Sequence, residues 1–313
     1  LIPFVRPNLL FPCVVLLLFP VFTHFTAFLI SPSLKNPADM AARVFGPLIT
    51  QPAAGRHSAT LIMLHGLGDT GNGWAPVGPQ LNLPHIKMVF PTAPTRPISI
   101  NMGMSMPGWF DLKSLDSDDL QAAMGGKALD PEGIAESIKY VDDLIAAEVA
   151  AGTPTDRIVL GGFSQGGHIA LKAFLRHEPA LAGCAALSTW LEPSKMPYSK
   201  EALRRPIFLA HGSADPLLPP ILAQTSYKTL NDAGASSVDF RIYPGMQHSS
   251  CPEEMSDFAA FLKRVVPDAP PSLSDLQGFS VKQLKQLLSS QGISTKGMFE
   301  KQELLEAASR LAK

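Results

Sequence analysis

The sequence predicts an α/β fold in which helices cover both faces of a mainly parallel sheet. Apolar runs and helical patterns alternate from about residue 59 to residue 265, as they do when strands and helices follow each other along the chain. The 313 residues are 46% hydrophobic and 17% charged, which is enough apolar material for one globular core and excludes a disordered chain. The formal net charge of -1 gives the whole molecule no electrostatic attraction to nucleic acid.

The predicted strands and helices follow from the periodicity of their apolar residues. The strands are ATLIMLHG (59–66), IKMVFPTAP (86–94), DRIVLGGF (156–163), AGCAALSTW (182–190), PIFLAHGSAD (206–215) and VDFRIYPG (238–245). The helices cover residues 131–150, 165–177, 219–233 and 252–264. In such a fold ligands bind beyond the carboxyl ends of the strands, and four polar residues follow predicted strands: His65, Ser164, Asp215 and His248.

The first 39 residues differ from the rest of the chain. No Asp, Glu, Lys or Arg occurs from Pro7 to Leu34, and the segment resembles a signal peptide or a signal anchor. A second interpretation is upstream sequence translated by a gene model, because the first methionine is Met40 and an ordinary soluble sequence follows it. Three widely spaced cysteines without a C-x-x-C pair fit a reduced compartment. We expect a cytoplasmic protein, or a secretory, membrane or organellar one if residues 1–39 are a targeting segment.

The C-terminal end forms a separate unit in the sequence. We expect the main domain to cover residues 40–266, a Pro/Ser-rich linker residues 267–275 and a helical hairpin residues 276–313. Two sets of apolar residues have the spacing of one helix face each: Val281, Leu284, Leu287 and Leu288, then Leu304, Leu305 and Ala308.

The stretch GGFSQGGH (161–168) places Ser164 between glycines two positions before and two positions after it. In a sharp strand-to-helix turn, a side chain at either glycine position would collide with the neighbouring strand or helix. The alternative is a plain glycine-rich turn. Against it, an apolar strand precedes the motif, an amphipathic helix follows it, and Asp215 and His248 come later in the order of a Ser-Asp-His triad.

These residues have complementary roles in acyl transfer. His248 would accept the proton of Ser164 and return it to the leaving group, and Asp215 would fix the imidazole tautomer. The backbone N–H groups of Gln165 and of Leu67, in the glycine-rich loop HGLGDTGNG (65–73), are the expected oxyanion donors. The loop lacks the G-x-x-x-x-G-K-[ST] motif of a nucleotide-binding loop, so we do not expect it to cradle a phosphate.

Five segments carry a resemblance to a known family. LIMLHGLGDTGNGW, FPTAPTRPISINMGMSMPGWFDL, RIVLGGFSQGG, LAHGSADPLLP and YPGMQHSSCPEEM are similar, in order and spacing, to the acyl-protein thioesterase and lysophospholipase group of serine α/β-hydrolases. The resemblance covers about residues 45 to 266. It implies an α/β-hydrolase fold, hydrolysis of acyl thioesters on S-acylated proteins and of lysophospholipid or carboxylic esters, no metal or organic cofactor, a cytosolic location and a homodimer.

The same resemblance assigns the triad to Ser164, Asp215 and His248 and the oxyanion donors to Leu67 and Gln165. A short-chain carboxylesterase is the alternative activity, because the same acyl-enzyme serves both. An alternative of another class is an inactive scaffold that presents the C-terminal module.

Other residues have weaker assignments. Met102, Met104, Met106 and Trp109 form a soft apolar segment that could hold an acyl chain, or equally fill core or interface space. His65 and His211, each before a glycine, are expected to hold loop backbone in place. Cys251 is close to His248, but no elbow surrounds it, so we reject it as a nucleophile.

The C-terminal module resembles a SAP-type helix-extension-helix unit, which binds DNA in some proteins and protein in others. Between Asp275 and Lys313 six basic residues exceed four acidic ones by two. This small excess favours contact with protein over contact with nucleic acid.

Overall fold

The computed structural model describes residues 44–113, 130–192 and 198–311. The predicted N-terminal segment, residues 1–39, lies outside the described residues. Among the described residues no helix combines the length and the apolar character needed to cross a membrane.

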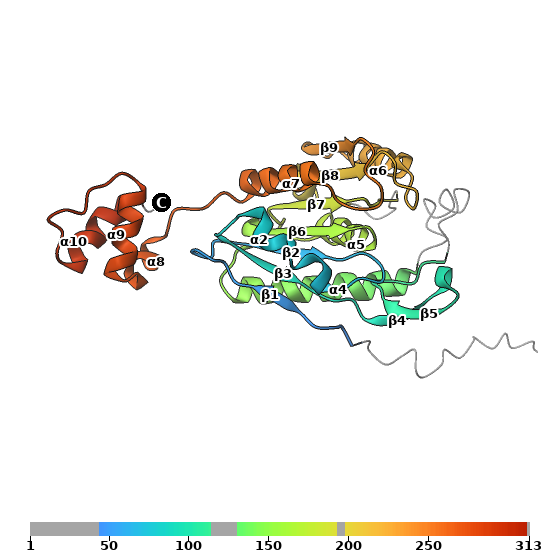
Figure 1. Ribbon diagram of the computed structural model, residues 1–313, viewed down its shortest axis with the longest axis horizontal. Helices are drawn as coiled ribbons and strands as arrows, with labels where there is room; N and C mark the ends of the chain where they lie inside the picture. Colours follow the sequence, from blue (N-terminus) through green and yellow to red (C-terminus); the bar gives the residue numbers. More distant parts are fainter. Residues whose placement is uncertain (1–43, 114–129, 193–197, 312–313) are drawn as a thin grey trace, which may run out of the picture. The chain divides into compact units, whose positions relative to one another are not determined.

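A seven-stranded sheet forms the centre of the larger domain (Figure 1). Its spatial order is β1-β3-β2-β6-β7-β8-β9. Only β1 is antiparallel to its neighbour, β3, and the other pairs are parallel. The strands are β1 (Ile49–Gln51), β2 (Ala59–Leu64), β3 (Ile86–Phe90), β6 (Ile158–Phe163), β7 (Gly183–Leu187), β8 (Ile207–Gly212) and β9 (Val238–Tyr243). All six predicted strands are confirmed, and the three-residue edge strand β1 is an addition.

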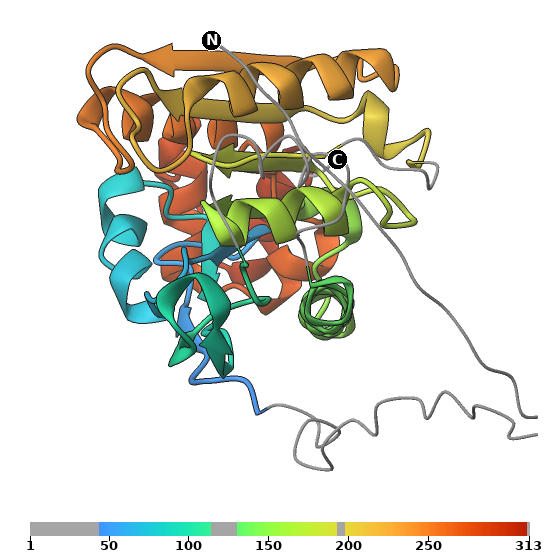
Figure 2. The ribbon, with the colours of Figure 1, turned by 90° about the vertical axis from the view of Figure 1, so that its right-hand side faces the viewer.

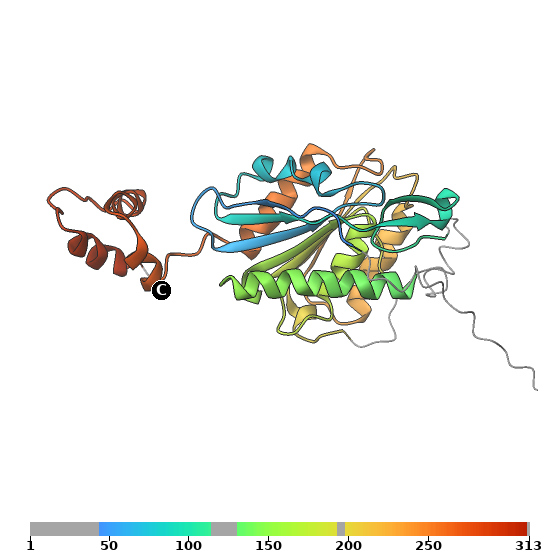
Figure 3. The same ribbon diagram turned by 90° about the horizontal axis from the view of Figure 1, so that it is seen from below.

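Helices pack on both faces of this sheet, as predicted (Figure 2 and Figure 3). One face carries α4 (Pro131–Ala150), α5 (Gln165–Phe174) and α6 (Pro220–Asp232), and the other carries α1 (Gly71–Trp74), α2 (Val77–Leu81) and α7 (Pro252–Val265). Single 3₁₀ turns occupy Ser99–Asn101, Thr155–Arg157 and Ala202–Arg204.

Strand alternation divides the core into two layers. In β2, Ile62 and Leu64 contact the layer under α4 and α5, whereas Leu61 and Met63 contact the layer under α7. All six residues of β2 are buried, which is typical of a central parallel strand covered on both sides. The loops at the carboxyl ends of these strands are therefore held by a rigid base.

A small hairpin, absent from the sequence prediction, stands apart from the main sheet. It consists of β4 (Thr95–Ile98) and β5 (Met104–Pro107), paired antiparallel. Met102 adopts a left-handed conformation with φ of 55° in the connection between these strands. Its side chain is 89% exposed, and that of Met104 is 55% exposed.

Up to residue 311, where the described chain ends, the C-terminal module has three helices and not the two of the predicted hairpin. They are α8 (Leu273–Gly278), α9 (Val281–Ser290) and α10 (Lys301–Ser309). The predicted linker, residues 267–275, is wrong at its end because α8 begins inside it: Ser272 and Asp275 cap each other's backbone N–H groups. The module buries a core of its own, made by Leu276, Leu284, Leu288, Leu304 and Ala308.

One buried carboxyl group stands out in the larger domain. Glu254, in the first turn of α7, is 0% exposed, and neither of its carboxyl oxygens has a hydrogen-bond partner among the described residues. Burial disfavours the charged form and raises the pKa of Glu254 to about 8, from a usual 4.5. The folded protein therefore keeps this proton at pH values where the unfolded chain has lost it.

This difference makes the stability of the domain depend on pH. The folded state binds the extra proton between about pH 4.5 and about pH 8, so the free energy of unfolding falls as pH rises through that window. We expect Glu254→Gln, which cannot ionise, to melt roughly 5 °C above the parent at pH 9 and to lose this advantage below pH 5. Tryptophan fluorescence melting curves would measure it. The exposed neighbour, in Glu253→Gln, is the control; equal pH profiles for parent and Glu254→Gln would contradict the prediction.

Candidate active site

Ser164 lies in a sharp turn between β6 and α5. Its φ of 53° and ψ of -122° are strained for a residue with a side chain. A Cβ at Gly162 would lie 2.4 Å from the backbone of Gly166, and a Cβ at Gly166 would lie 2.4 Å from the carbonyl oxygen of His65. The two glycines therefore allow the turn to pack closely enough to hold Ser164 in this conformation.

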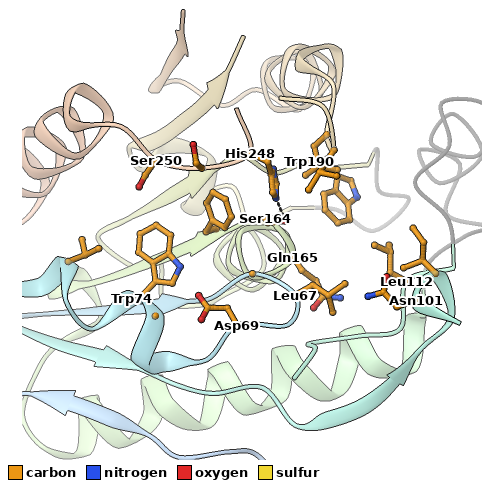
Figure 4. Close-up of a pocket in the computed structure, with 18 residues that line it drawn as sticks. Leu67, Asp69, Trp74, Asn101, Leu112, Ser164, Gln165, Trp190, His248 and Ser250 are labelled. Atoms are coloured by element: carbon orange, nitrogen blue, oxygen red, sulfur yellow. Dashed lines mark hydrogen bonds between the residues drawn. The ribbon is translucent and has the colours of Figure 1, made fainter. Parts of the chain in front are cut away.

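The structure brings together Ser164, His248 and Asp215, which come from three different loops. Ser164 Oγ lies 2.9 Å from His248 Nε2 (Figure 4). On the other side of the same ring, His248 Nδ1 lies 2.7 Å from Asp215 Oδ2. The loop after β8 carries Asp215, and the loop after β9 carries His248. In the neutral imidazole, Nδ1–H donates to the carboxylate and Nε2 accepts from the serine hydroxyl. This arrangement can deprotonate the hydroxyl during attack on an acyl group.

Asp215 is held as a carboxylate by its surroundings. Its Oδ1 accepts hydrogen bonds of 2.9 Å from the backbone N–H groups of Leu217 and Leu218. Burial alone would raise the pKa of Asp215, but hydrogen bonds from His211, His248 and the Leu218 amide outweigh it and keep the pKa well below its usual range. Asp215 thus stays charged and can stabilise a protonated His248.

His211 contacts the same carboxylate oxygen as His248. Its Nε2 lies 2.7 Å from the carbonyl oxygen of Leu218 and 3.3 Å from Asp215 Oδ2. These two contacts tie the loop that follows β8 to the end of its own strand. The side chain holds loop backbone, as the sequence analysis expected.

The expected oxyanion donors face the same region. Both Leu67 and Gln165 line the cleft beside Ser164, and neither backbone N–H donates to another described residue. Gln165 is the first residue of α5, where the helix leaves N–H groups unpaired. The two amides are therefore available to an oxygen that gains negative charge next to Ser164.

His65 fixes the orientation of the Leu67 amide. Its Nε2 accepts from the Ala93 N–H at 3.0 Å, which leaves Nδ1–H to donate to the Gly66 carbonyl at 2.6 Å. That carbonyl and the Leu67 N–H belong to one planar trans peptide and point in opposite directions. Burial lowers the pKa of His65, so the neutral tautomer is retained.

A cleft of about 630 Å³ opens over Ser164. Figure 4 shows Asp69 and Trp74 on one side of Ser164 and Asn101, Leu112 and Trp190 on the other. The lining side chains include Leu67, Asp69, Trp74, Val77, Ile100, Asn101, Leu112, Phe163, Trp190, Leu217, Leu218, Ser249 and Ser250.

The apolar segment assigned to substrate in the sequence analysis does not line this cleft. Met102 and Met104 are exposed on the β4–β5 hairpin, and Met106 is half-buried with its sulfur against Asn101. Trp109 is fully buried behind the oxyanion loop, where its Nε1–H donates to the His65 carbonyl and its backbone N–H to Gln165 Oε1. The cleft is lined by the predicted Leu67, Ser164, Gln165 and His248. Its other lining residues were not predicted, because they come from several separate segments of the chain.

The structure also describes Cys251 and the candidate metal ligands. Cys251 caps the N-terminus of α7, its Sγ accepting from the Glu254 N–H. Among the described residues, no group of three or more His, Cys, Asp or Glu side chains is placed to hold a metal ion.

Residues 47–266 match the family model described as phospholipase/carboxylesterase. The chain belongs to the phospholipase/carboxylesterase family. As a member of this family it has the α/β-hydrolase fold and is a hydrolase of the serine esterase type. The resemblance found for residues 45–266 is confirmed. Residues 271–313 match a second model, described as the E3 ubiquitin-protein ligase rififylin-like domain.

Several known proteins are similar to this chain over most of their own length. Acyl-protein thioesterase 1 of Cryptococcus neoformans is 43% identical over 66% of this chain and 92% of its own, and that of Gibberella zeae is 42% identical over 73% and 99%. The crystal structure of Zea mays acyl-protein thioesterase 2 is 31% identical, with a TM-score of 0.61 over 71% of this chain and 99% of its own. That of Arabidopsis thaliana SOBER1 is 29% identical, with a TM-score of 0.61 over 67% and 99%.

Substitution of Asp215 tests the proposed catalytic triad. We expect Asp215→Asn to lower kcat about 10³- to 10⁴-fold with little change in KM, because the amide no longer favours the Nδ1–H tautomer of His248. Steady-state hydrolysis of a short ester at neutral pH would measure this. Retention of more than a tenth of the parent kcat would contradict the assignment.

Substitution of His65 tests whether this residue orients the Gly66–Leu67 peptide bond, whose N–H is the expected oxyanion donor. We expect His65→Gln to lower kcat roughly 10- to 100-fold, less than outright loss of an oxyanion donor, with KM nearly unchanged. His85→Gln is the matched control, since His85 is also buried and bonds a carbonyl, that of Val266, away from the cleft. Similar kcat losses in both variants would show a general effect on folding instead.

Proposed function

We propose that the protein hydrolyses acyl thioesters of protein cysteines, with the S-palmitoyl group as the model substrate. The observation that carries this proposal is the hydrogen-bonded chain Ser164, His248 and Asp215 beneath a cleft with an apolar side. The acyl-protein thioesterases similar to this chain support the substrate class.

The reaction has two halves. Ser164 Oγ attacks the acyl carbon while His248 takes its proton, and the amides of Leu67 and Gln165 bind the resulting oxyanion. Collapse breaks the carbon–sulfur bond, the departing cysteine sulfur receives the proton from His248, and the acyl group stays on Ser164. Water then attacks the acyl carbon of the acyl-Ser164 ester while His248 accepts its proton. The carbon–oxygen bond to Ser164 breaks, Ser164 Oγ takes the proton back, and the carboxylic acid leaves.

The acyl chain would lie on the apolar side of the cleft. Leu67, Leu112 and Trp190 lie on that side in Figure 4 and carry no charge. Ile100, Leu217 and Leu218 also line the cleft and are apolar. An alkyl chain gains about 0.8 kcal/mol per buried methylene, so this surface favours long acyl groups over short ones. Lysophospholipid and carboxylic esters share the acyl-enzyme and are secondary substrates.

We also propose that the C-terminal module contacts a protein partner. Phe299 is 83% exposed and Leu273 59% exposed on this small unit, and its modest positive charge favours protein over nucleic acid. A homodimer and a cytoplasmic location remain expectations from the family resemblance.

The deciding experiment compares hydrolysis of a palmitoyl-cysteine peptide and a short-chain ester by the protein and by Ser164→Ala. We expect the long thioester to have the higher kcat/KM, and both activities to fall at least about 10³-fold in the variant. Ser237→Ala, an exposed serine, is the control.

Each other outcome points to a different function. A Ser164-dependent preference for the short ester would assign a carboxylesterase. Turnover that survives Ser164→Ala would remove Ser164 as the nucleophile. No turnover of either substrate would favour the scaffold.

A further inference from the structure

The side of the cleft opposite the apolar surface has a different chemistry. Asp69, Trp74 and Ser250 lie on it in Figure 4. Ser249 and Ser250 directly follow His248, the residue that returns the proton to the leaving group. The leaving half of a substrate has to lie within reach of His248, and the opposite side is assigned to the acyl chain, so we call this side the leaving-group side.

Aromatic rings connect the catalytic histidine to this side without interruption. The ring of Phe163 lies 4.9 Å from that of His248 between centroids, and the ring of Trp74 lies 5.6 Å from that of Phe163. Trp74 is 7% exposed, so its ring is fixed by packing and what remains accessible faces the cleft. A leaving group that departs past His248 would therefore contact the rings of Phe163 and Trp74.

Asp69 is the only Asp, Glu, Lys or Arg among the described residues that line the cleft. Its Oδ1 accepts a hydrogen bond of 2.7 Å from the Thr70 N–H, and no ion pair joins it to a described lysine or arginine. A Cβ at Gly73 would lie 2.2 Å from the same Oδ1, so the carboxylate rests against the residue that precedes Trp74. Carboxylate and indole thus share one end of the cleft.

We propose that Asp69 and Trp74 form a subsite for a positively charged group in the leaving half of the substrate, here a lysine or arginine side chain next to the acylated cysteine. A carboxylate attracts such a cation by its charge, and an indole ring attracts it by its quadrupole. The inference rests on the proposed function and adds a sequence preference to it. The choline headgroup of lysophosphatidylcholine is also a cation and is the second source from which such a positively charged group could come.

Three S-palmitoyl peptides that differ at one residue beside the cysteine, Lys, Ala or Glu, provide the test. We expect kcat/KM for the Lys peptide to exceed that for the Glu peptide about tenfold at low ionic strength, and the ratio to shrink as salt screens the charges. Asp69→Asn should bring the ratio close to one, and Trp74→Leu should reduce it in part. Asp232→Asn, an exposed carboxylate on α6 paired with Lys228, should leave the ratio at its parent value.

Three results would overturn the subsite. They are equal turnover of the Lys and Glu peptides by the parent, a ratio that Asp69→Asn does not change, and an equal loss on all peptides together with a lower melting temperature. The last would make Asp69 a loop-capping residue only.

Failure of the proposed function has a separate signature, the absence of Ser164-dependent turnover of any of the three peptides. In that case the hydrolysis rates of lysophosphatidylcholine and lysophosphatidylglycerol of equal acyl length are compared to test the subsite. A choline preference that Asp69→Asn abolishes supports the subsite with the lipid headgroup as its cation, and equal rates on the two lipids refute it.

Discussion

The close approach of two loops, one after β2 and one after β6, is the constraint on which the site depends. The strands pair in parallel with Leu64 opposite Gly162, so both loops leave the sheet at the same level. Gly166 then rests on the carbonyl oxygen of His65. This contact places the nucleophile from one loop beside the two amides, one from each loop, that would bind the oxyanion. A displacement of either strand would separate them.

Hydrogen bonds convert this approach into a defined geometry. The Gln165 side chain accepts from the Trp109 N–H and donates to the Phe110 carbonyl, so a third segment is tied to the turn at Ser164. Trp109 in turn donates to the His65 carbonyl. Because these groups are buried, each unmade bond would cost roughly 1–3 kcal/mol. The site is therefore organised before substrate arrives, which is the condition for strong stabilisation of developing charge.

Sequence reasoning succeeded where local signals decide the structure. Helix α4 begins and ends at the predicted residues, and its start is fixed by the Asp130 cap and by Pro131 in its first turn. The reasoning failed where tertiary contacts decide: β1 is three residues long, and Ile100, Leu112, Trp190 and Leu217 meet only in the folded chain. The start of α8 was readable from Ser272 and Asp275, a capping pair that the linker composition obscured.

The separate core of the C-terminal module affects how the protein can be observed. The chain has three tryptophans, Trp74, Trp109 and Trp190, and all lie in the larger domain. Their fluorescence reports the melting of that domain alone, whereas far-ultraviolet circular dichroism also includes α8, α9 and α10. Two units with independent cores need not unfold in one cooperative step, so the two signals have different midpoints when the stabilities differ. When the midpoints differ, the tryptophan signal gives the melting temperature of the larger domain and not of the whole chain.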